Sequence, residues 1–499
     1  MTLTLPSRTV SRERRPLEMG SPGVREPKLD SLSPAWLGIL SIVAIVVVAA
    51  GASQGTAAGI VALVGVVAML YLASHPVVLT LMAVAVVPVT SGLARGLPVP
   101  GVRLSESLVV FAAFVVILVQ GKRLPGPRWT SVDKFALAYC FGALIFGVVD
   151  LALHQVTVAG DDLQTMLGPI QFFLIYRTMA AGLVTHRSRI LAIRLILLMS
   201  IPVSAIAIAQ QFLGQPVTNV LVSMTGTTVF NTPGFEPVFR ATSVFPIWHA
   251  LAGYILVVIL LSAGLLLTRD REVLPVWGHF VVLVTGSFAL LFSLTTTVIV
   301  GAVIGILIMG AMTGRLARVL TWCVVLGGGA VLLFYPLIAS RIASQAIATA
   351  DTPGDGTSFL PQTLQYRFGV WTDQYFPALN GSWLTGYGPA EPPGIDWHHT
   401  ESGFITILLR GGLMYLILTA ILITLVALHA RNRLATARST SEGGLAAAIF
   451  ALAVVFPIIN LVFPYVTASG LPQPLWMLWG ILAASEVRKF RPASAEVKW

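Results

Sequence analysis

The sequence predicts an all-helical integral membrane protein, a polytopic bundle of about 12–14 transmembrane helices. Hydrophobic residues make up 56% of the chain and charged residues only 10%, and the mean hydropathy is +0.85. Continuous apolar runs of about 20 residues recur along the chain, which is the length a helix needs to cross a bilayer. Composition and run length therefore indicate the same fold class.

The apolar runs define the elements in order. The first 34 residues are polar and rich in Arg, Pro and Ser, and we expect a disordered tail there. The first apolar run lacks a small-residue cleavage site, so we expect a retained helix rather than a signal peptide. The expected spans are 35–52, 57–74, 76–93, 106–120, 134–153, 163–183, 188–213, 246–268, 274–293, 296–313, 318–338, 404–429, 445–463 and 471–487.

The distribution of Lys and Arg predicts the topology. With the N-terminus inside, seven polar segments on one side hold 24 of the 31 basic residues. Both termini are then cytoplasmic, the transmembrane domain covers 35–487, and a cytoplasmic tail covers 488–499. Two large segments, 214–245 and 339–403, face the other side. Because the net charge of +10 follows topology in this way, we expect no nucleic-acid partner.

Arginines flank the two outer segments. The positive-inside rule makes basic residues unusual on that side. A guanidinium stays charged and binds phosphate in a bidentate manner, which suits a lipid-linked pyrophosphate. We therefore predict a pyrophosphate site built from Arg240, Arg341, Arg367 and Arg410. Interfacial anchoring is the simpler interpretation of Arg95 and Arg103.

An acid–base cluster precedes the apolar run at 404. His398, His399 and Glu401 lie next to one another, and a histidine beside a carboxylate can exchange protons near neutral pH. We predict that this cluster deprotonates an acceptor hydroxyl. No third ligand stands at a recognisable spacing, so we expect no metal. Cys140 and Cys323 lie inside apolar runs and are expected to be small core residues.

Aromatic residues are frequent in the larger outer segment. Their faces offer apolar area to sugar rings, although Trp and Tyr also gather at membrane interfaces. Arg367 and Trp371 are four residues apart and share one face of an expected amphipathic helix. Residues 386–389, Gly-Tyr-Gly-Pro, predict a turn. The candidate sugar-binding residues are Tyr366, Trp371, Tyr387 and Trp397.

These local signals resemble the O-antigen ligase and O-antigen polymerase superfamily of bacterial membrane glycosyltransferases. The resemblance rests on Arg367 with Trp371, on the 386–389 segment, and on a loop exit similar to H-[NSQ]-x9-G-x2-[GTY]. At that exit Glu401-Ser402 precedes Gly412 by the family spacing, but Glu401 takes the place of the histidine. A second departure is that 292–297 lacks the arginine of the family's Ser-Arg-Gly segment. The motif-level resemblance spans about 290–430.

The resemblance implies a GT-C-like fold and an inverting, metal-independent glycosyltransferase without a cofactor. The expected donor is an undecaprenyl diphosphate-linked glycan, and the expected acceptor is a hydroxyl on another glycan or lipid. Transfer would occur at the outer face of the bacterial cytoplasmic membrane. Arg367, helped by Arg341 and Arg410, would bind the pyrophosphate, and either Glu401 or His399 would act as the base.

Three functional alternatives stay open at this stage. A polymerase, which transfers to another lipid-linked repeat, is preferred because no special acceptor site is readable. A ligase would transfer to a different lipid or protein. A flippase for lipid-linked sugars is the alternative of another class. It would favour charges near mid-membrane and paired broken helices, and the sequence shows neither.

Overall fold

The computed structural model describes residues 56–95, 103–119, 129–154, 160–227, 239–336, 339–340, 362–389, 400–466 and 469–485. Every regular element within these residues is helical, which confirms the predicted all-helical class. The predicted tails and the first predicted span, 35–52, lie outside the described residues. The chain divides into two compact units at His75, and helix α2 (Thr56–Ser74) is the described part of the first.

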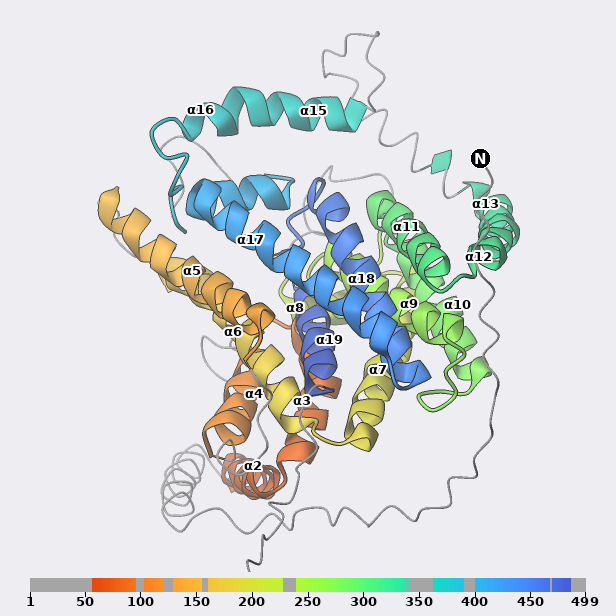
Figure 1. Cartoon of the computed structure of the whole chain (residues 1–499). Helices are drawn as coiled ribbons and strands as arrows, with labels where there is room; N and C mark the ends of the chain where they lie inside the picture. The colour runs from red at the N-terminus through yellow and green to blue at the C-terminus, as the bar shows by residue number, and fades with distance from the viewer. Residues whose placement is uncertain are drawn as a thin grey trace, which may run out of the picture. The chain divides into compact units, whose positions relative to one another are not determined.

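The second unit contains the remaining helices (Figure 1). Most of them fall on the predicted apolar runs, because helices form where a continuous apolar surface can be buried or can face lipid. The helices at 215–225 and 362–378 lie instead in the two predicted outer segments. In order the helices of the second unit are α3 (Pro76–Thr90), α4 (Leu104–Ala113) with π-helical η1 (Phe114–Val119), α5 (Ser131–Leu153), α6 (Gly160–Gly182), α7 (His186–Leu213), α8 (Gln215–Thr225), α9 (Trp248–Leu267), α10 (Val276–Phe292), α11 (Thr296–Met312), α12 (Leu316–Trp322) with η2 (Cys323–Gly327) and α13 (Gly328–Leu333), α15 (Gln362–Val370) with η3 (Trp371–Tyr375) and α16 (Phe376–Ala378), α17 (Gly403–Thr436), α18 (Thr440–Asn460) and α19 (Pro472–Ala484).

Five of the described helices are long and apolar enough to cross a membrane: α5, α7, α9, α17 and α18. The count rises to six if Val64–Ser74 and Pro76–Thr90 form one span. Shorter apolar helices, such as α10 and α11, accompany them. These helices support a polytopic membrane protein. Helix α9 is buried along almost its whole length, as expected for a helix that is hydrophobic all round.

The second unit has two ends that differ in their contacts. At one end of the unit, α5 and α18 end and α9 and α17 begin, and we call this the loop end. There the Ala241 amide donates to the carbonyl of Phe292, at the end of α10. At the opposite end the Thr440 hydroxyl donates to Asp270 at 2.9 Å, which connects the start of α18 to the end of α9.

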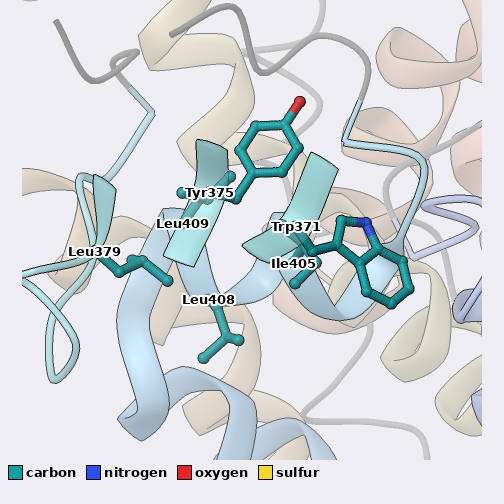
Figure 2. Packing of buried hydrophobic residues seen from close by; sticks show 6 residues of the cluster. All are labelled: Trp371, Tyr375, Leu379, Ile405, Leu408 and Leu409. Atoms are coloured by element: carbon teal, nitrogen blue, oxygen red, sulfur yellow. The ribbon is translucent and has the colours of Figure 1, made fainter. Parts of the chain in front are cut away.

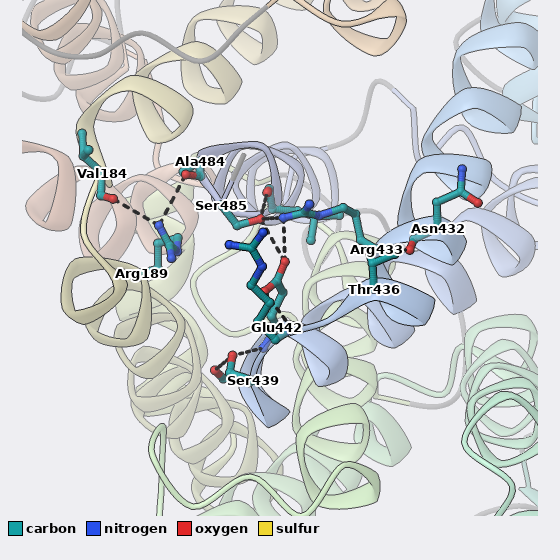
Figure 3. Close-up of polar contacts among 12 residues, drawn as sticks. Val184, Arg189, Asn432, Arg433, Thr436, Ser439, Glu442, Ala484 and Ser485 are labelled. Carbon is teal, nitrogen blue, oxygen red and sulfur yellow. Dashed lines mark hydrogen bonds and ion pairs between the residues drawn. The ribbon is translucent and has the colours of Figure 1, made fainter. Parts of the chain in front are cut away.

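A polar network fastens the opposite end (Figure 3). Arg433 of α17 donates to the Glu442 carboxylate at 2.6 Å and also to the Ser485 hydroxyl. Arg189 of α7 donates to the Ala484 carbonyl at 3.4 Å. These contacts link four helices, α7, α17, α18 and α19. Their donors are charged, and charged donors form stronger hydrogen bonds than neutral ones.

The described basic residues lie toward both ends of the second unit. Arg177, Arg189, Arg269, Arg315 and Arg433 belong to the helix termini at the opposite end. The described arginines toward the loop end are Arg95, Arg103, Arg240, Arg367 and Arg410.

Candidate functional site

The first feature of the site is a helix that lies across the start of α17. Helix α15, η3 and α16 run on without a break, and we call them together the loop helix (Gln362–Ala378). Its apolar face packs on the first turns of α17, as Figures 1 and 2 show. The buried cluster between them consists of Trp371, Tyr375, Leu379, Ile405, Leu408 and Leu409.

Trp371 is the anchor of this packing. Its side chain is only 6% exposed, and its indole N–H donates to the Thr400 carbonyl at 3.2 Å. A buried indole with its one donor satisfied supplies packing area and fixes orientation. The structure thus gives Trp371 a packing position, in place of the open sugar-binding face expected from the sequence. Tyr366, on the same helix, is exposed.

The loop helix brings Arg367 to Glu401. The guanidinium Nε donates to Oε2 of Glu401 at 2.7 Å, a distance typical of a charge-assisted hydrogen bond. The Arg367 side chain is 18% exposed and that of Glu401 is 43% exposed. An ion pair this accessible adds little to stability, because solvent screens it. Stability alone therefore does not explain why the chain places Arg367 against Glu401.

The backbone holds Glu401 in an unusual conformation. Its φ of 48° lies in the left-handed region, which is uncommon for residues other than glycine. The neighbouring residues fix it there: the Thr406 hydroxyl donates to the Ser402 carbonyl at 2.9 Å, and the Ser402 hydroxyl donates to the Asn460 carbonyl at 3.3 Å. A residue whose backbone is kept in such a conformation by its surroundings is typical of functional sites.

Two residues from distant elements complete the cluster. His249, at the start of α9, stacks on Phe463 with ring centroids 4.0 Å apart. Its Nδ1 lies 3.4 Å from the Tyr465 hydroxyl. The charge of Arg367 acts on both His249 and Tyr465. Neither residue was selected from the sequence. The available signal was an ionisable residue, His249, at the end of an apolar run beside an outer segment.

Arg240 reaches the same region from the segment before α9. Its guanidinium lies over the Trp248 ring, 4.5 Å from the centroid, and Trp248 in turn contacts His249 with rings 5.8 Å apart. The Gln210 side chain accepts from the amides of Thr242 and Ser243 at 2.9 and 3.0 Å, which fixes this segment on α7. Arg240 is buried, at 5% exposed, and its described ring contact is with Trp248.

The turn at 386–389 docks onto a break in α17. Gly411 and Gly412 have non-helical backbone angles, so α17 is two helical segments, a break that its apolar pattern does not reveal. The Tyr387 amide donates to the Leu409 carbonyl at 2.6 Å, and the Leu413 amide donates to the Trp383 carbonyl at 2.8 Å. Two segments that carry the family resemblance therefore contact each other directly.

The other predicted residues occupy different places. Tyr387 contacts the His154 ring at 4.5 Å, and its hydroxyl donates to the Ala378 carbonyl at 2.7 Å. Arg410 lies at the break in α17, near Tyr415 and Tyr139. Arg341, Trp397, His398 and His399 lie outside the described residues.

At the loop end the structure has one guanidinium–carboxylate pair, Arg367 with Glu401. A second guanidinium, that of Arg240, lies over Trp248 at the start of α9, next to His249. Such groups can bind an anion and accept a proton. No group of three or more His, Cys, Asp or Glu residues suited to a metal ion is found within the described part of the chain. No protein-family model matches the chain, and no curated protein matches its sequence.

Proposed function

We propose that the protein is a membrane glycosyltransferase that uses a polyprenyl diphosphate-linked glycan, with undecaprenyl diphosphate as the lipid carrier. The observation that carries the proposal is the ion pair between Arg367 and Glu401, accessible at the loop end of a bundle of apolar helices. The helices provide surface for a polyprenyl chain, and the arginines provide partners for a diphosphate. The loop end then faces away from the cytoplasm, since most basic residues gather at the opposite end.

Arg367 and Arg240 bind the diphosphate of the donor in this mechanism. A diphosphate oxygen replaces the Glu401 carboxylate as the partner of Arg367, and this exchange releases Glu401. The fixed positive charges stabilise the negative charge that develops as the diphosphate leaves. Donor binding and preparation of the base are thereby coupled.

Glu401 then accepts the proton of the acceptor hydroxyl. The acceptor oxygen forms a bond to the anomeric carbon while the bond from that carbon to the diphosphate oxygen breaks. The electron pair leaves with the polyprenyl diphosphate, and the proton ends on the Glu401 carboxylate. A direct displacement of this kind inverts the configuration of the anomeric carbon. His399 is the second candidate for this role from the sequence.

We further propose that the acceptor is another lipid-linked glycan, which makes the enzyme a polysaccharide polymerase. The test uses the purified full chain in liposomes with synthetic undecaprenyl diphosphate oligosaccharide, and mass spectrometry follows the products. Longer lipid-linked glycan and released undecaprenyl diphosphate are expected, and both should be lost with Arg367→Ala. Arg318→Ala, an exposed arginine of α12, is the matched control.

Other outcomes of this experiment would replace the proposal. Consumption of donor only after a foreign acceptor is added would make the enzyme a ligase. An intact donor under every condition, with fluorescent lipid-linked glycan moving across the bilayer, would make the protein a flippase.

A further inference from the structure

His249 is a described histidine at the loop end that the proposed mechanism does not use. It is the second residue of α9, its side chain is partly exposed, and the charge of Arg367 acts on it. Phe463 stacks on one face of the ring at 4.0 Å and so fixes the ring plane. A histidine ring stacked in this way has a defined plane, and its two nitrogens have different surroundings.

The neighbour of Nδ1 is the Tyr465 hydroxyl at 3.4 Å, toward the long end of hydrogen-bond distances. Tyr465 is 1% exposed. Burial raises the pKa of its hydroxyl, and the charge of Arg367 offsets this only in part. The phenol therefore keeps its proton and can donate a hydrogen bond to Nδ1. In a neutral imidazole, an Nδ1 that accepts leaves the ring proton on Nε2.

The opposite edge of the ring carries Nε2. Within the described residues, no hydrogen bond to His249 Nε2 is present, and the residue is largely but not fully buried. A neutral Nε2–H donor adds no positive charge beside Arg367 and Arg240. It thereby avoids the repulsion that a third cation would add before an anion arrives.

We infer that neutral His249 donates a hydrogen bond from Nε2 to the diphosphate that Arg367 and Arg240 bind, and that Tyr465 positions it by fixing the tautomer. The inference rests on the proposed donor site and adds a binding residue to it. The ligand class is an organic diphosphate. Two cations and one oriented neutral donor around one anion form the kind of preorganised arrangement that stabilises developing negative charge.

Solid-state NMR on the full chain with ¹⁵N-labelled histidine tests the tautomer without any turnover. The chain has eight histidines, and the spectrum of His249→Gln identifies the signals of His249. The expected result is protonated Nε2 and unprotonated Nδ1, with a shift of the Nε2 signal when farnesyl diphosphate is added. Tyr465→Phe should allow the other tautomer to appear. A ring protonated on Nδ1 in the wild type would overturn the inference.

Calorimetric titration with farnesyl diphosphate separates this inference from the function on which it rests. His249→Ala should weaken binding by about tenfold or more, which is the loss expected for one hydrogen bond to a charged group. His249→Gln keeps an N–H donor and most of the volume, so it should recover part of the affinity. His186→Gln, an exposed histidine at the opposite end, is the control.

Two results would contradict the inference in different ways. If wild-type protein binds farnesyl diphosphate and folded His249→Ala binds it equally well, His249 is not a ligand and the proposed donor site stands. If the wild type itself does not bind the diphosphate, the donor site and the inference fall together.

Discussion

The guanidinium of Arg367 and the carboxylate of Glu401 meet at 2.7 Å across 34 positions of the chain. Each is thus occupied by the other before a substrate arrives. In the proposed reaction the diphosphate displaces Glu401, so the carboxylate competes with the donor for Arg367. Because of this competition, substitution of Glu401 and substitution of Arg367 should affect donor affinity differently.

Glu401→Gln should separate binding from chemistry. The neutral amide is a weaker partner for Arg367 than a carboxylate, so affinity for the lipid-linked donor should stay the same or increase. Turnover should fall by about 10²–10⁴-fold, the usual contribution of a general base. Arg367→Ala should lower both quantities. Donor binding measured by titration, together with single-turnover rates, checks this.

Glu272→Gln, which alters an exposed carboxylate at the opposite end, is the control for the Glu401 variant. Equal loss of donor binding in Glu401→Gln and Arg367→Ala would mean that the pair only holds the loop helix in place. The role of Glu401 as the base would then be rejected.

Trp371 distinguishes packing from sugar binding. Trp371→Phe keeps an aromatic ring in the cluster and loses the hydrogen bond to Thr400, so we expect a loss of about 1 kcal/mol of stability and nearly unchanged turnover. Trp371→Ala should cost about 3–5 kcal/mol, because it empties a buried site. Thermal unfolding in detergent and turnover are the measurements. A folded Trp371→Phe protein without activity would restore the sugar-binding role.

Much of the fold could be predicted from sequence because apolar runs record burial or contact with lipid. The run predicted at 188–213 is α7 (His186–Leu213), for example. Only part of the candidate site could be predicted from the sequence. Arg367 and Glu401 each carry a local signal, but their contact depends on how the loop helix docks. His249 and Tyr465 lie in separate elements, and no sequence spacing connects them. Trp371 is buried with its indole N–H bonded, and a sequence pattern cannot tell a packed indole from an open one.

Gly412→Ala should disturb the break in α17. The glycine has a φ of 62°, and an added Cβ would collide with the backbone of Leu384 and Thr385. Both effects act against the docked turn, so we expect a loss of about 2 kcal/mol or more and faster proteolysis near residue 385. Gly369→Ala is the matched control, since nothing lies within 4 Å of its Cβ position. Equal behaviour of the two variants would contradict the docking described here.

Substitution of Arg433 should affect the stability of the protein and leave its activity unchanged. Its contacts with Glu442 and Ser485 fasten α19 at the opposite end, away from the Arg367 cluster. Arg433→Ala should cost about 1–3 kcal/mol, the range for hydrogen bonds to a charged group. Turnover per folded molecule should not change. Arg431→Ala, an exposed neighbour on the same helix, is the control. A specific loss of turnover in Arg433→Ala would show coupling between the two ends.

Two aspartates of α5 should respond in opposite directions to the same substitution. Asp133 is buried and accepts hydrogen bonds from Arg177 at 2.6 Å and from the Tyr176 hydroxyl at 2.9 Å. Asp133→Asn leaves the guanidinium without its counter-charge, so we expect a loss of about 3–5 kcal/mol. Asp150 is also buried, and the Thr385 hydroxyl and the Gly388 amide lie near its carboxylate, but neither oxygen has a hydrogen bond of ordinary geometry within the described residues.

Asp150→Asn should therefore leave stability unchanged or raise it by about 1 kcal/mol, because the amide carries no charge to desolvate. Thermal unfolding of the two variants, each prepared in the same detergent, makes the comparison. Asp150 faces the turn that docks on α17, near Thr385 and Gly388. A marked loss of stability in Asp150→Asn would mean that the carboxylate holds this turn through a hydrogen bond or a bound water, and the turn would then depend on charge at α5.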